Sequence, residues 1–550
     1  MLQGLMMQMP LLISSLIEHA DRHHGDAEIV SRRVEGDTHR TTYHELHRRA
    51  RQLANALAGL SVARSERVAT LAWNGYRHME LYFAVSGAGS VLHTINPRLH
   101  PEQIAWIVNH AEDRALFFDL TFLPLVEAIA PLCKTVKRWV LMTDRAHMPA
   151  EKSEKIGKLT CYEDLIDDRS DKFTWPQFDE NTASSICYTS GTTGNPKGAL
   201  YSHRSTLLHT MASALPDALN VSARDVILPV VPMFHVNAWG LPYVAPMAGA
   251  KIVFPGPHLD GKSLYELFES EKVTLSAGVP TVWQGLLAFM EASDLKFSTM
   301  NRTVIGGSAC PPAMIRLFQD KYGVRVLHAW GMTEMSPLGT ACTFKQKHTE
   351  LSAEQRLPVQ YKQGRALYGV DMKIVDDDGS DLPWDGVAFG NLLVRGPWVA
   401  RDYYESGEGT PLVSDEDGKT WFPTGDVSNI DGDGYMQITD RSKDVIKSGG
   451  EWISSIEIEN IAVSHPAVAM AACIAAAHPK WDERPLLVVV KKPNASVTRD
   501  ELLAHYDGKV AKWQVPDDVA FVDAIPLGAT GKILKTKLRE QFREHRLPTA

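Results

Sequence analysis

The segment 188–198 has the composition of a loop that holds phosphate. It reads YTSGTTGNPKG and gathers three glycines, three threonines, a serine and one lysine directly after an apolar run. Glycine lets backbone N–H groups turn toward an anion, hydroxyls donate further hydrogen bonds, and an ammonium group meets terminal phosphates. The segment therefore predicts a polyphosphate-binding loop, whose candidate ligands are Thr189, Ser190, Gly191, Thr192, Thr193, Gly194 and Lys197.

The spacing of this loop differs from that of a Walker loop, in which the lysine follows the second glycine and precedes serine or threonine. Here Lys197 comes before the last glycine, Gly198. The pattern therefore predicts a nucleotide enzyme of another kind. An ordinary surface loop rich in glycine, serine and threonine is the alternative.

Size, charge and cysteine pattern narrow the class of protein. A chain of 550 residues is too long for one core and predicts two or more domains. The net charge of -9, without a concentrated basic run, argues against a nucleic-acid partner. The six cysteines form no CxxC pair, which fits reduced thiols in the cytoplasm. No uncharged apolar stretch reaches the ~18 residues that span a bilayer, so no membrane partner is expected.

Short apolar runs alternate with helical patterns along most of the chain, which predicts an α/β fold of parallel sheets covered by helices. We expect a large N-terminal domain over residues 1–440, with a β-rich part from about residue 370 because strands bounded by Asp-Gly and Gly-Pro turns begin there. Residues 441–550 are expected to form a small mobile α/β domain, joined by a hinge at Asp440. We also expect an amphipathic first helix from the apolar start and a helix over 501–513.

Several motifs in a fixed order make the chain resemble the AMP-forming adenylating enzymes, which include acyl-CoA synthetases, firefly luciferase and the adenylation domains of peptide synthetases. The resemblance runs from Thr42 in the segment TYHEL, through the loop at 188–198, to the pair Gly531 and Lys532. It implies an enzyme that activates a carboxylic acid with ATP as an acyl-adenylate and releases pyrophosphate. The acyl group then passes to a nucleophile.

Two motifs of the large domain are expected to bind the nucleotide. Small residues at 306–309 let a flat base approach the backbone, and the resemblance sets Gly307, Ser308 and Ala309 against adenine. In WGMTE at 330–334, an aromatic face can stack on adenine, a hydroxyl can reach the α-phosphate and a carboxylate can hold Mg²⁺. A strand-end turn and a helix N-cap are the alternatives. The resemblance assigns to the nucleotide site His328, Ala329, Trp330, Gly331, Met332, Thr333 and Ile438, and to the metal Thr193 and Glu334.

Where this chain has Trp330, the family usually has tyrosine, so stacking is kept and a hydroxyl is lost. Further along, Asp426 in the segment WFPTGD offers paired acceptors that suit two ribose hydroxyls, although an aspartate in a simple turn is the alternative.

The charged, glycine-containing run after Asp440 suits a hinge that changes its backbone dihedrals, with a static linker as the alternative. The resemblance gives Arg441 a ribose contact and lets a thiol arm pass close to Gly449 and Gly450. It also adds to the cofactor site Lys443, Ser448, Glu451 and Trp452.

Lys532 is expected to be the catalytic lysine of acid activation. A compact ammonium group can offset negative charge on the carboxylate and the α-phosphate together, whereas an isolated surface lysine is the alternative. The preceding residues 526–528 lack the basic residue and threonine that are common there in the family. Because Lys532 lies ~90 residues beyond the hinge, it must enter and leave the site by rotation of the small domain. The other expected catalytic residues are His235, Thr333 and Glu334.

The segment PMFHVNAWG at 232–240 is expected to contact the acid. It closely resembles fatty acyl-CoA synthetases, in which a tryptophan at the place of Trp239 gates an acyl tunnel and His235 would border the carboxylate. Ordinary buried core aromatics are the alternative. The segment suggests no charged acyl tail, so we expect 3-methylmercaptopropionate or a medium-chain fatty acid, with a long-chain fatty acid as the alternative. The expected substrate residues are His235, Val236, Trp239, Gly307 and Gly331.

Free CoA is the expected acceptor, because no carrier-type Asp-Ser-Leu segment appears. The predicted function is an AMP-forming acyl-CoA ligase that uses ATP, Mg²⁺ and CoA. A luciferase-like enzyme and a non-catalytic nucleotide-binding relative are the alternatives. The resemblance also implies a homodimer, and a cytoplasmic location is expected.

Overall fold

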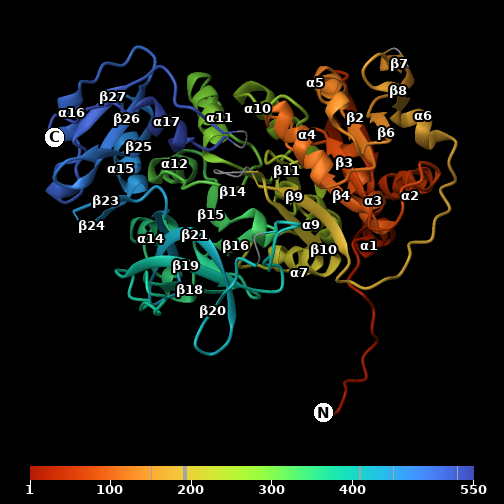
Figure 1. The fold of residues 1–550 in the computed structure, drawn as a ribbon, viewed down its shortest axis with the longest axis horizontal. Coiled ribbons are helices and arrows are strands. Elements are labelled where there is room, and N and C mark those ends of the chain that lie inside the picture. The colour runs from red at the N-terminus through yellow and green to blue at the C-terminus, as the bar shows by residue number, and fades with distance from the viewer. Residues whose placement is uncertain (150–151, 190–194, 408–409, 450, 529–530) are drawn as a thin grey trace.

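The computed structural model describes residues 1–149, 152–189, 195–407, 410–449, 451–528 and 531–550. These residues form two large sheets, a β-rich part and a smaller C-terminal sheet covered by helices (Figure 1). The predicted α/β class is confirmed. Among the described residues, no helix combines the length and the apolar character needed to cross a membrane.

One large sheet has eight strands in the order β10-β9-β4-β3-β5-β6-β8-β7. Its inner strands run parallel and are buried on both faces, which explains their nearly continuous apolar sequences. At one edge β9 and β10 pair antiparallel, so the predicted phosphate loop connects two neighbouring strands. The strands are β3 (Arg67–Leu71), β4 (Val91–Thr94), β5 (Ala115–Phe118), β6 (Arg138–Leu141), β7 (Lys152–Ser153), β8 (Gly157–Cys161), β9 (Ala183–Tyr188) and β10 (Gly198–Ser202).

The other large sheet has nine strands in the order β17-β16-β15-β14-β13-β11-β12-β1-β2. Because β14 and β15 are parallel neighbours, the segment 306–309 after β14 and the segment 330–334 at the end of β15 lie at the same edge of the sheet. The strands are β1 (Glu28–Arg32), β2 (Thr38–Thr42), β11 (Val226–Pro229), β12 (Lys251–Phe254), β13 (Leu275–Gly278), β14 (Arg302–Ile305), β15 (Arg325–Gly331), β16 (Leu338–Ala341) and β17 (Arg365–Ala366).

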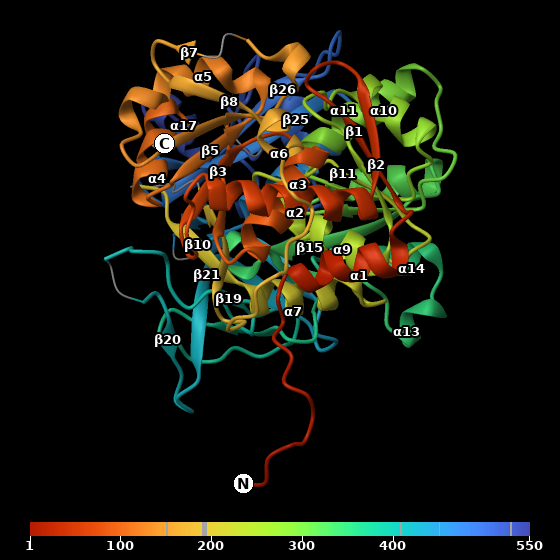
Figure 2. The same cartoon turned by 90° about the vertical axis from the view of Figure 1, so that its right-hand side faces the viewer.

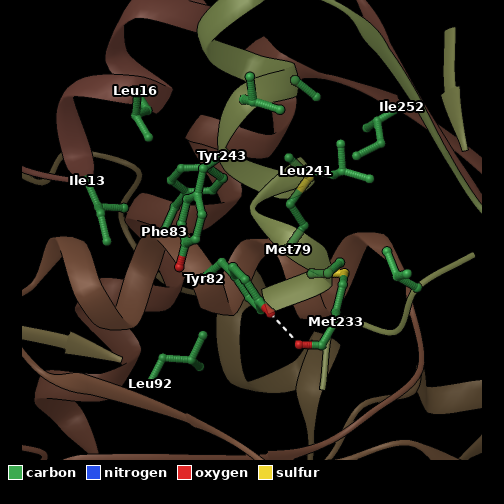
Figure 3. Close-up of a cluster of buried hydrophobic side chains, with 14 of the residues drawn as sticks. Ile13, Leu16, Met79, Tyr82, Phe83, Leu92, Met233, Leu241, Tyr243 and Ile252 are labelled. Carbon is green, nitrogen blue, oxygen red and sulfur yellow. Dashed lines mark hydrogen bonds between the residues drawn. The ribbon is translucent and has the colours of Figure 1, made fainter. Parts of the chain in front are cut away.

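Helices cover both sheets, and α3 is buried along its whole length. Its residues Met79, Tyr82 and Phe83 pack in one core with Leu241 and Tyr243 from α9 (Figure 3). The helices of this part are α1 (Ser14–His24), α2 (Tyr43–Gly59), α3 (Tyr76–Gly87), α4 (Pro101–His110), α5 (Leu123–Ile129), α6 (Tyr162–Asp167), α7 (His203–Ala214), α8 (Val236–Trp239), α9 (Leu241–Ala248), α10 (Gly261–Ser270), α11 (Pro280–Ala292), α12 (Pro312–Arg316), α13 (Gln346–Thr349) and α14 (Ala353–Gln360).

The β-rich part begins near residue 370, where the sequence changes from alternating strands and helices to strands bounded by turns. Its strands are β18 (Asp371–Val375), β19 (Phe389–Arg395), β20 (Val413–Ser414), β21 (Thr420–Ile430) and β22 (Met436–Arg441), all paired antiparallel. The segment DGDGY at 431–435 forms the turn between β21 and β22, where the backbone N–H of Gly434 donates to the Asp431 carbonyl. The sequence reading of this segment as a hairpin turn is therefore confirmed.

The C-terminal part has its own sheet and its own buried core. Its strands are β23 (Ile446–Ser448), β24 (Glu451–Ile453), β25 (Val468–His478), β26 (Asp482–Lys491) and β27 (Asp518–Phe521), and its helices are α15 (Ser455–Val463), α16 (Arg499–Ala504) and α17 (Lys535–Gln541). Since β22 ends at Arg441 and the next sheet starts with β23, the chain changes sheets close to Asp440. The domain division at residue 440 itself stays a prediction.

Two expected helices differ in the structure. The helix expected over 501–513 is wrong beyond Ala504, where α16 ends, and Gly508 adopts a left-handed φ of 73°. The first helix, α1, begins only at Ser14, and residues 1–9 extend away from the body with exposed side chains (Figure 2). A proline at position 10 disfavours helical backbone just before it, and apolar residues there find no surface to pack on.

Candidate active site

The two ends of the predicted phosphate loop lie together at the end of the β9–β10 pair. The backbone N–H of Thr189 donates to the carbonyl of Lys197 at 2.9 Å. The Lys197 ammonium lies 5.4 Å from the ring centroid of Tyr403. The remaining predicted loop ligands, Ser190, Gly191, Thr192, Thr193 and Gly194, fall outside the described residues.

Glycine is required where β14 and β15 end. Gly307 adopts a φ of 79°, which side chains with a Cβ rarely adopt. A Cβ on Gly331 would stand 2.0 Å from the Pro337 carbonyl oxygen, and one on Gly306 would stand 2.8 Å from that of Ala329. These close backbone approaches leave no room for a side chain on Gly306 or Gly331, and the predicted adenine-site residues Ser308 and Ala309 follow directly.

Trp330 and Asp426, which the sequence assigned to the same nucleotide, are in direct contact. The indole Nε1–H of Trp330 donates to Asp426 Oδ2 at 2.8 Å, and Arg441 Nε lies 4.0 Å from Oδ1. Burial raises the pKa of Asp426, while Arg441 and the indole hydrogen bond lower it. The tryptophan therefore fixes the carboxylate that is expected to receive ribose, a contact that the sequence reading did not foresee.

Glu334 lies in a buried turn next to the phosphate loop. The Tyr403 hydroxyl donates to Glu334 Oε1 at 2.6 Å, and burial raises the pKa of Glu334 while this hydrogen bond opposes the rise. A second hydroxyl, from Tyr201 on β10, donates to the Thr333 carbonyl at 2.6 Å. Sequence reasoning missed both tyrosines; the position of Tyr201 three residues after Gly198 was the one usable signal.

The donor chemistry of this turn fits Mg²⁺. Magnesium takes one or two carboxylate oxygens and completes its shell with water and phosphate oxygens. Glu334 supplies one hard oxygen donor group, and no group of three or more metal-ligating side chains occurs among the described residues. A magnesium ion here would therefore be shared with the phosphates of a nucleotide.

Lys532 reaches this site from the C-terminal part. Its Cε lies 3.7 Å from the position that a Cβ on Gly307 would occupy. Burial, followed by the nearby Arg441, lowers the pKa of Lys532 to about 8, whereas Asp426 and Glu334 favour its charged form. The structure thus brings together the predicted catalytic lysine and the two carboxylates that were predicted to bind ribose and the metal.

The predicted acyl gate lies over the same glycines. The indole of Trp239 lies close to both glycines. Its carbons are 3.5 Å from the position that a Cβ on Gly306 would occupy and 3.7 Å from that of a Cβ on Gly307. Burial and Lys532 lower the pKa of His235 to about 3, so its imidazole is neutral near pH 7.

The residues of the gate have an unusual backbone. Val236, Asn237, Ala238 and Trp239 adopt φ values of 46°, 50°, 48° and 56°. Each non-glycine residue in this left-handed region costs ~1–2 kcal/mol, so the surrounding contacts must hold the turn in place.

Some predicted site residues have other contacts. Both ring nitrogens of His328 are engaged, with the Cys310 N–H at 3.2 Å and the Tyr361 carbonyl at 3.1 Å, so only its backbone can face a nucleotide. The backbone N–H of Ile438 donates to the side chain of Gln363. Ala329, Met332 and Lys443 lie in or beside the elements that carry Trp330 and Arg441.

The predicted thiol-arm residues lie on the β23–β24 hairpin. A Cβ on Gly449 would stand 2.7 Å from the Trp481 ring, Ser448 accepts a hydrogen bond from Arg484, and Trp452 packs on Phe389. Glu451 is exposed, and Gly450 falls outside the described residues. Among the described residues, this hairpin makes no hydrogen bond or ion pair with Lys532.

Known proteins match this chain over nearly its whole length. A family model described as AMP-binding enzyme matches residues 16–404, and one described as AMP-binding enzyme C-terminal domain matches 457–532. A 3-methylmercaptopropionyl-CoA ligase of Ruegeria lacuscaerulensis is 57% identical, with 98% of this chain and 99% of the relative covered. A medium-chain-fatty-acid–CoA ligase of Ectopseudomonas oleovorans is 55% identical, with 98% and 97% covered.

A solved structure has the same fold. The anthranilate CoA ligase AuaEII in complex with anthranoyl-AMP superposes with a TM-score of 0.84 at 25% identity, covering 96% of this chain and 97% of that one. The resemblance read from the sequence motifs is therefore confirmed, and the chain belongs to the AMP-binding enzyme family.

Proposed function

We propose that this protein is an AMP-forming acyl-CoA ligase, which activates a carboxylic acid with ATP and transfers the acyl group to CoA. The observation that carries this proposal is the meeting of Lys532 with Glu334 and Asp426 beside Gly307. A cation and two carboxylates in different surroundings suit a nucleotide whose α-phosphate is attacked by the carboxylate of the acid substrate.

The residues of the site divide the work of adenylate formation. Lys532 offsets the negative charge of the attacking carboxylate and the α-phosphate. Asp426 receives the ribose hydroxyls, and Trp330 holds it in place. Glu334 would hold Mg²⁺, which neutralises phosphate charge when it is bound. The neutral imidazole of His235 can border the substrate carboxylate without attracting it into an ion pair.

The acid is proposed to be short or medium in length and uncharged at its far end. Trp239 and Val279 are the side chains nearest the space above Gly307 other than Lys532, and both are apolar. The two relatives with 57% and 55% identity are named for 3-methylmercaptopropionate and medium-chain fatty acids. A thioether or alkyl chain matches such walls, because neither group needs a hydrogen-bond partner.

The experiment is an acid panel with purified protein, ATP, Mg²⁺ and CoA. We expect AMP, pyrophosphate and acyl-CoA with 3-methylmercaptopropionate and octanoate, and much slower turnover with palmitate. Formation of ADP, or AMP formation without a thioester, would refute the ligase proposal. A clear preference for palmitate would instead support the long-chain alternative. Magnesium removal by a chelator is expected to stop pyrophosphate release.

A homodimer and a cytoplasmic location stay predictions. Light scattering coupled to size-exclusion chromatography measures the mass directly, and a dimer would give twice the 60.9 kDa of one chain. Fractionation of the source cells tests the location.

A further inference from the structure

The left-handed turn at 236–239 needs an anchor. Four consecutive residues with a Cβ adopt positive φ there, and one of them is the β-branched Val236. Such a run does not persist by itself, because each residue is more stable in the right-handed region. The side chains of Val236 and Ala238 are buried and apolar, and apolar packing alone does not select one backbone conformation.

The side chain of Asn237 supplies specific polar contacts. It is 4% exposed, and its Nδ2 donates to Ser185 Oγ at 3.1 Å. Its Oδ1 lies 3.2 Å from the Tyr82 hydroxyl and 3.6 Å from Cys187 Sγ. Asparagine is also one of the few non-glycine residues that tolerate the left-handed region. Both ends of the amide are therefore held by buried groups.

These partners belong to rigid elements. Ser185 and Cys187 lie on β9, the strand that leads into the predicted phosphate loop, and Tyr82 lies on the fully buried helix α3. The Tyr82 hydroxyl is only 2.5 Å from the Met233 carbonyl, a contact visible in Figure 3, so it also fixes the chain just before the turn. The turn is thus attached to the sheet at its middle and to the helix at its start.

We propose that Asn237 is a positioning residue that holds the left-handed turn and thereby aims Trp239 over Gly306 and Gly307, setting the acyl chain length that the enzyme accepts. The direction of the indole depends on the backbone of its own residue, whose φ is 56°. If the turn relaxes to right-handed backbone, Trp239 leaves this position and the pocket loses its wall. The inference rests on the proposed acyl pocket.

The test compares the catalytic efficiency, kcat/KM, for octanoate with that for propionate. Trp239→Ala first measures the effect of losing the wall. Asn237→Ala removes the amide and disfavours the left-handed region, and Ser185→Ala removes one partner of the amide while leaving the turn sequence intact. Asn220→Ala is the matched control, since Asn220 also has a left-handed φ, 52°, but its side chain is exposed. The KM for ATP and the melting temperature are measured for each variant.

We expect Asn237→Ala to shift the octanoate-to-propionate ratio about tenfold in the direction of Trp239→Ala, and Ser185→Ala to shift it less. Added to Trp239→Ala, Asn237→Ala should change the ratio no further, because both act on the same indole. The KM for ATP should stay within about twofold in these variants, and Asn220→Ala should keep the wild-type ratio.

Two results would overturn the inference. If Trp239→Ala shifts the ratio but Asn237→Ala and Ser185→Ala leave it unchanged, the wall exists and Asn237 does not position it. If Trp239→Ala leaves the ratio unchanged, the proposed acyl wall has failed and the inference fails with it. Should Asn237→Ala not fold, Ser185→Ala decides alone: an unchanged ratio then contradicts the inference.

Discussion

The pKa of Lys532, a residue of the C-terminal part, depends on charged residues of the large part. Burial and Arg441 lower its pKa to about 8, while Asp426 and Glu334 across the site favour the charged form. Its ordinary pKa of 10.5 would leave it charged throughout the physiological range. In this site its charge instead changes near pH 8.

This shift gives a prediction about pH. Lys532 is protonated below its pKa, so the rate of adenylate formation should fall as pH rises through about 8. The measurement is kcat/KM for pyrophosphate exchange into ATP, which reports the free enzyme and avoids the titration of the CoA thiol. Lys532→Arg, which stays charged, should lose this fall even if it is slower overall. A wild-type profile that is flat to pH 10 would contradict the assignment.

Removing the ammonium group separates the two half-reactions. Lys532→Ala should reduce adenylate formation by at least about a hundredfold, since charge stabilisation of this kind contributes several kcal/mol. Transfer of the acyl group from supplied acyl-adenylate to CoA should stay near the wild-type rate. Both rates are measured on the same preparation, and an equal loss in the two would refute a role confined to activation.

Tyr403 is a residue that motif spacing did not reveal. Its hydroxyl donates to Glu334 Oε1, and the ring lies near the Lys197 ammonium. Tyr403→Phe keeps the ring and removes the hydrogen bond, which for an ionised acceptor is worth ~1.5–3 kcal/mol. We expect the KM for ATP at limiting magnesium to rise about tenfold or more.

The neighbouring Tyr404→Phe is the matched control for this prediction, because the contact of Tyr404 with Gly198 is made by its backbone N–H. Isothermal titration of each variant with a non-hydrolysable ATP analogue gives binding apart from turnover. If Tyr403→Phe behaves like Tyr404→Phe in both measurements, the hydroxyl does not position Glu334.

At the scale of the elements, the sequence was most informative where a motif follows a strand. The glycines after β14 and the WGMTE motif at the end of β15 could be assigned to one edge, because parallel neighbouring strands end together. The contacts of Tyr403 and Asn237 could not be predicted, since each depends on elements more than fifty residues away. The left-handed turn could not be predicted either, because no glycine or repeated turn residue marks its first four positions.

A buried ion pair links the predicted hinge to the segment of Lys532. Lys535 Nζ lies 2.6 Å from Glu459 Oε1 and also donates to Ser455 Oγ, while the backbone N–H of Ser455 donates to Asp440 Oδ2 at 2.6 Å. Burial raises the pKa of Glu459, and Lys535 opposes that rise. The first turn of α15 therefore connects Asp440 with the start of α17, three residues beyond Lys532.

Breaking this pair should destabilise the C-terminal part. Lys535→Met leaves a buried carboxylate without its cation and should cost about 3–5 kcal/mol, whereas Lys535→Met with Glu459→Gln should cost less because the charge is removed with its partner. Glutamine can still accept the Cys473 N–H bond at 2.8 Å. Denaturant titration measures the free energy of unfolding of both variants, and hydrogen exchange measures the protection of α15 and α17. A double variant no more stable than the single one would contradict this account.

At the scale of the whole molecule, the site is complete only when the C-terminal part lies against the large one. Gln284 on α11 donates from Nε2 to the carbonyl of Ala469, a residue of β25, at 2.5 Å, and α11 lies beside this part in Figure 1. This arrangement puts Lys532 beside Gly307 and leaves the β23–β24 hairpin against Phe389. We propose that this conformation serves acid activation and that CoA transfer follows a rotation that withdraws Lys532.

Locking the observed arrangement should therefore stop one half-reaction and spare the other. Cysteines at positions 284 and 469, joined by a short crosslinker with a reducible bond, would hold the two parts together where Gln284 now meets Ala469. The six native cysteines are buried, so the new pair should react first, and each single-cysteine variant controls for modification alone. Crosslinked protein should keep pyrophosphate exchange and lose acyl-CoA formation, and reduction should restore it. If crosslinked protein made acyl-CoA at the wild-type rate, rotation would not be needed, because Lys532 and the thiol could then use the site without exchanging places.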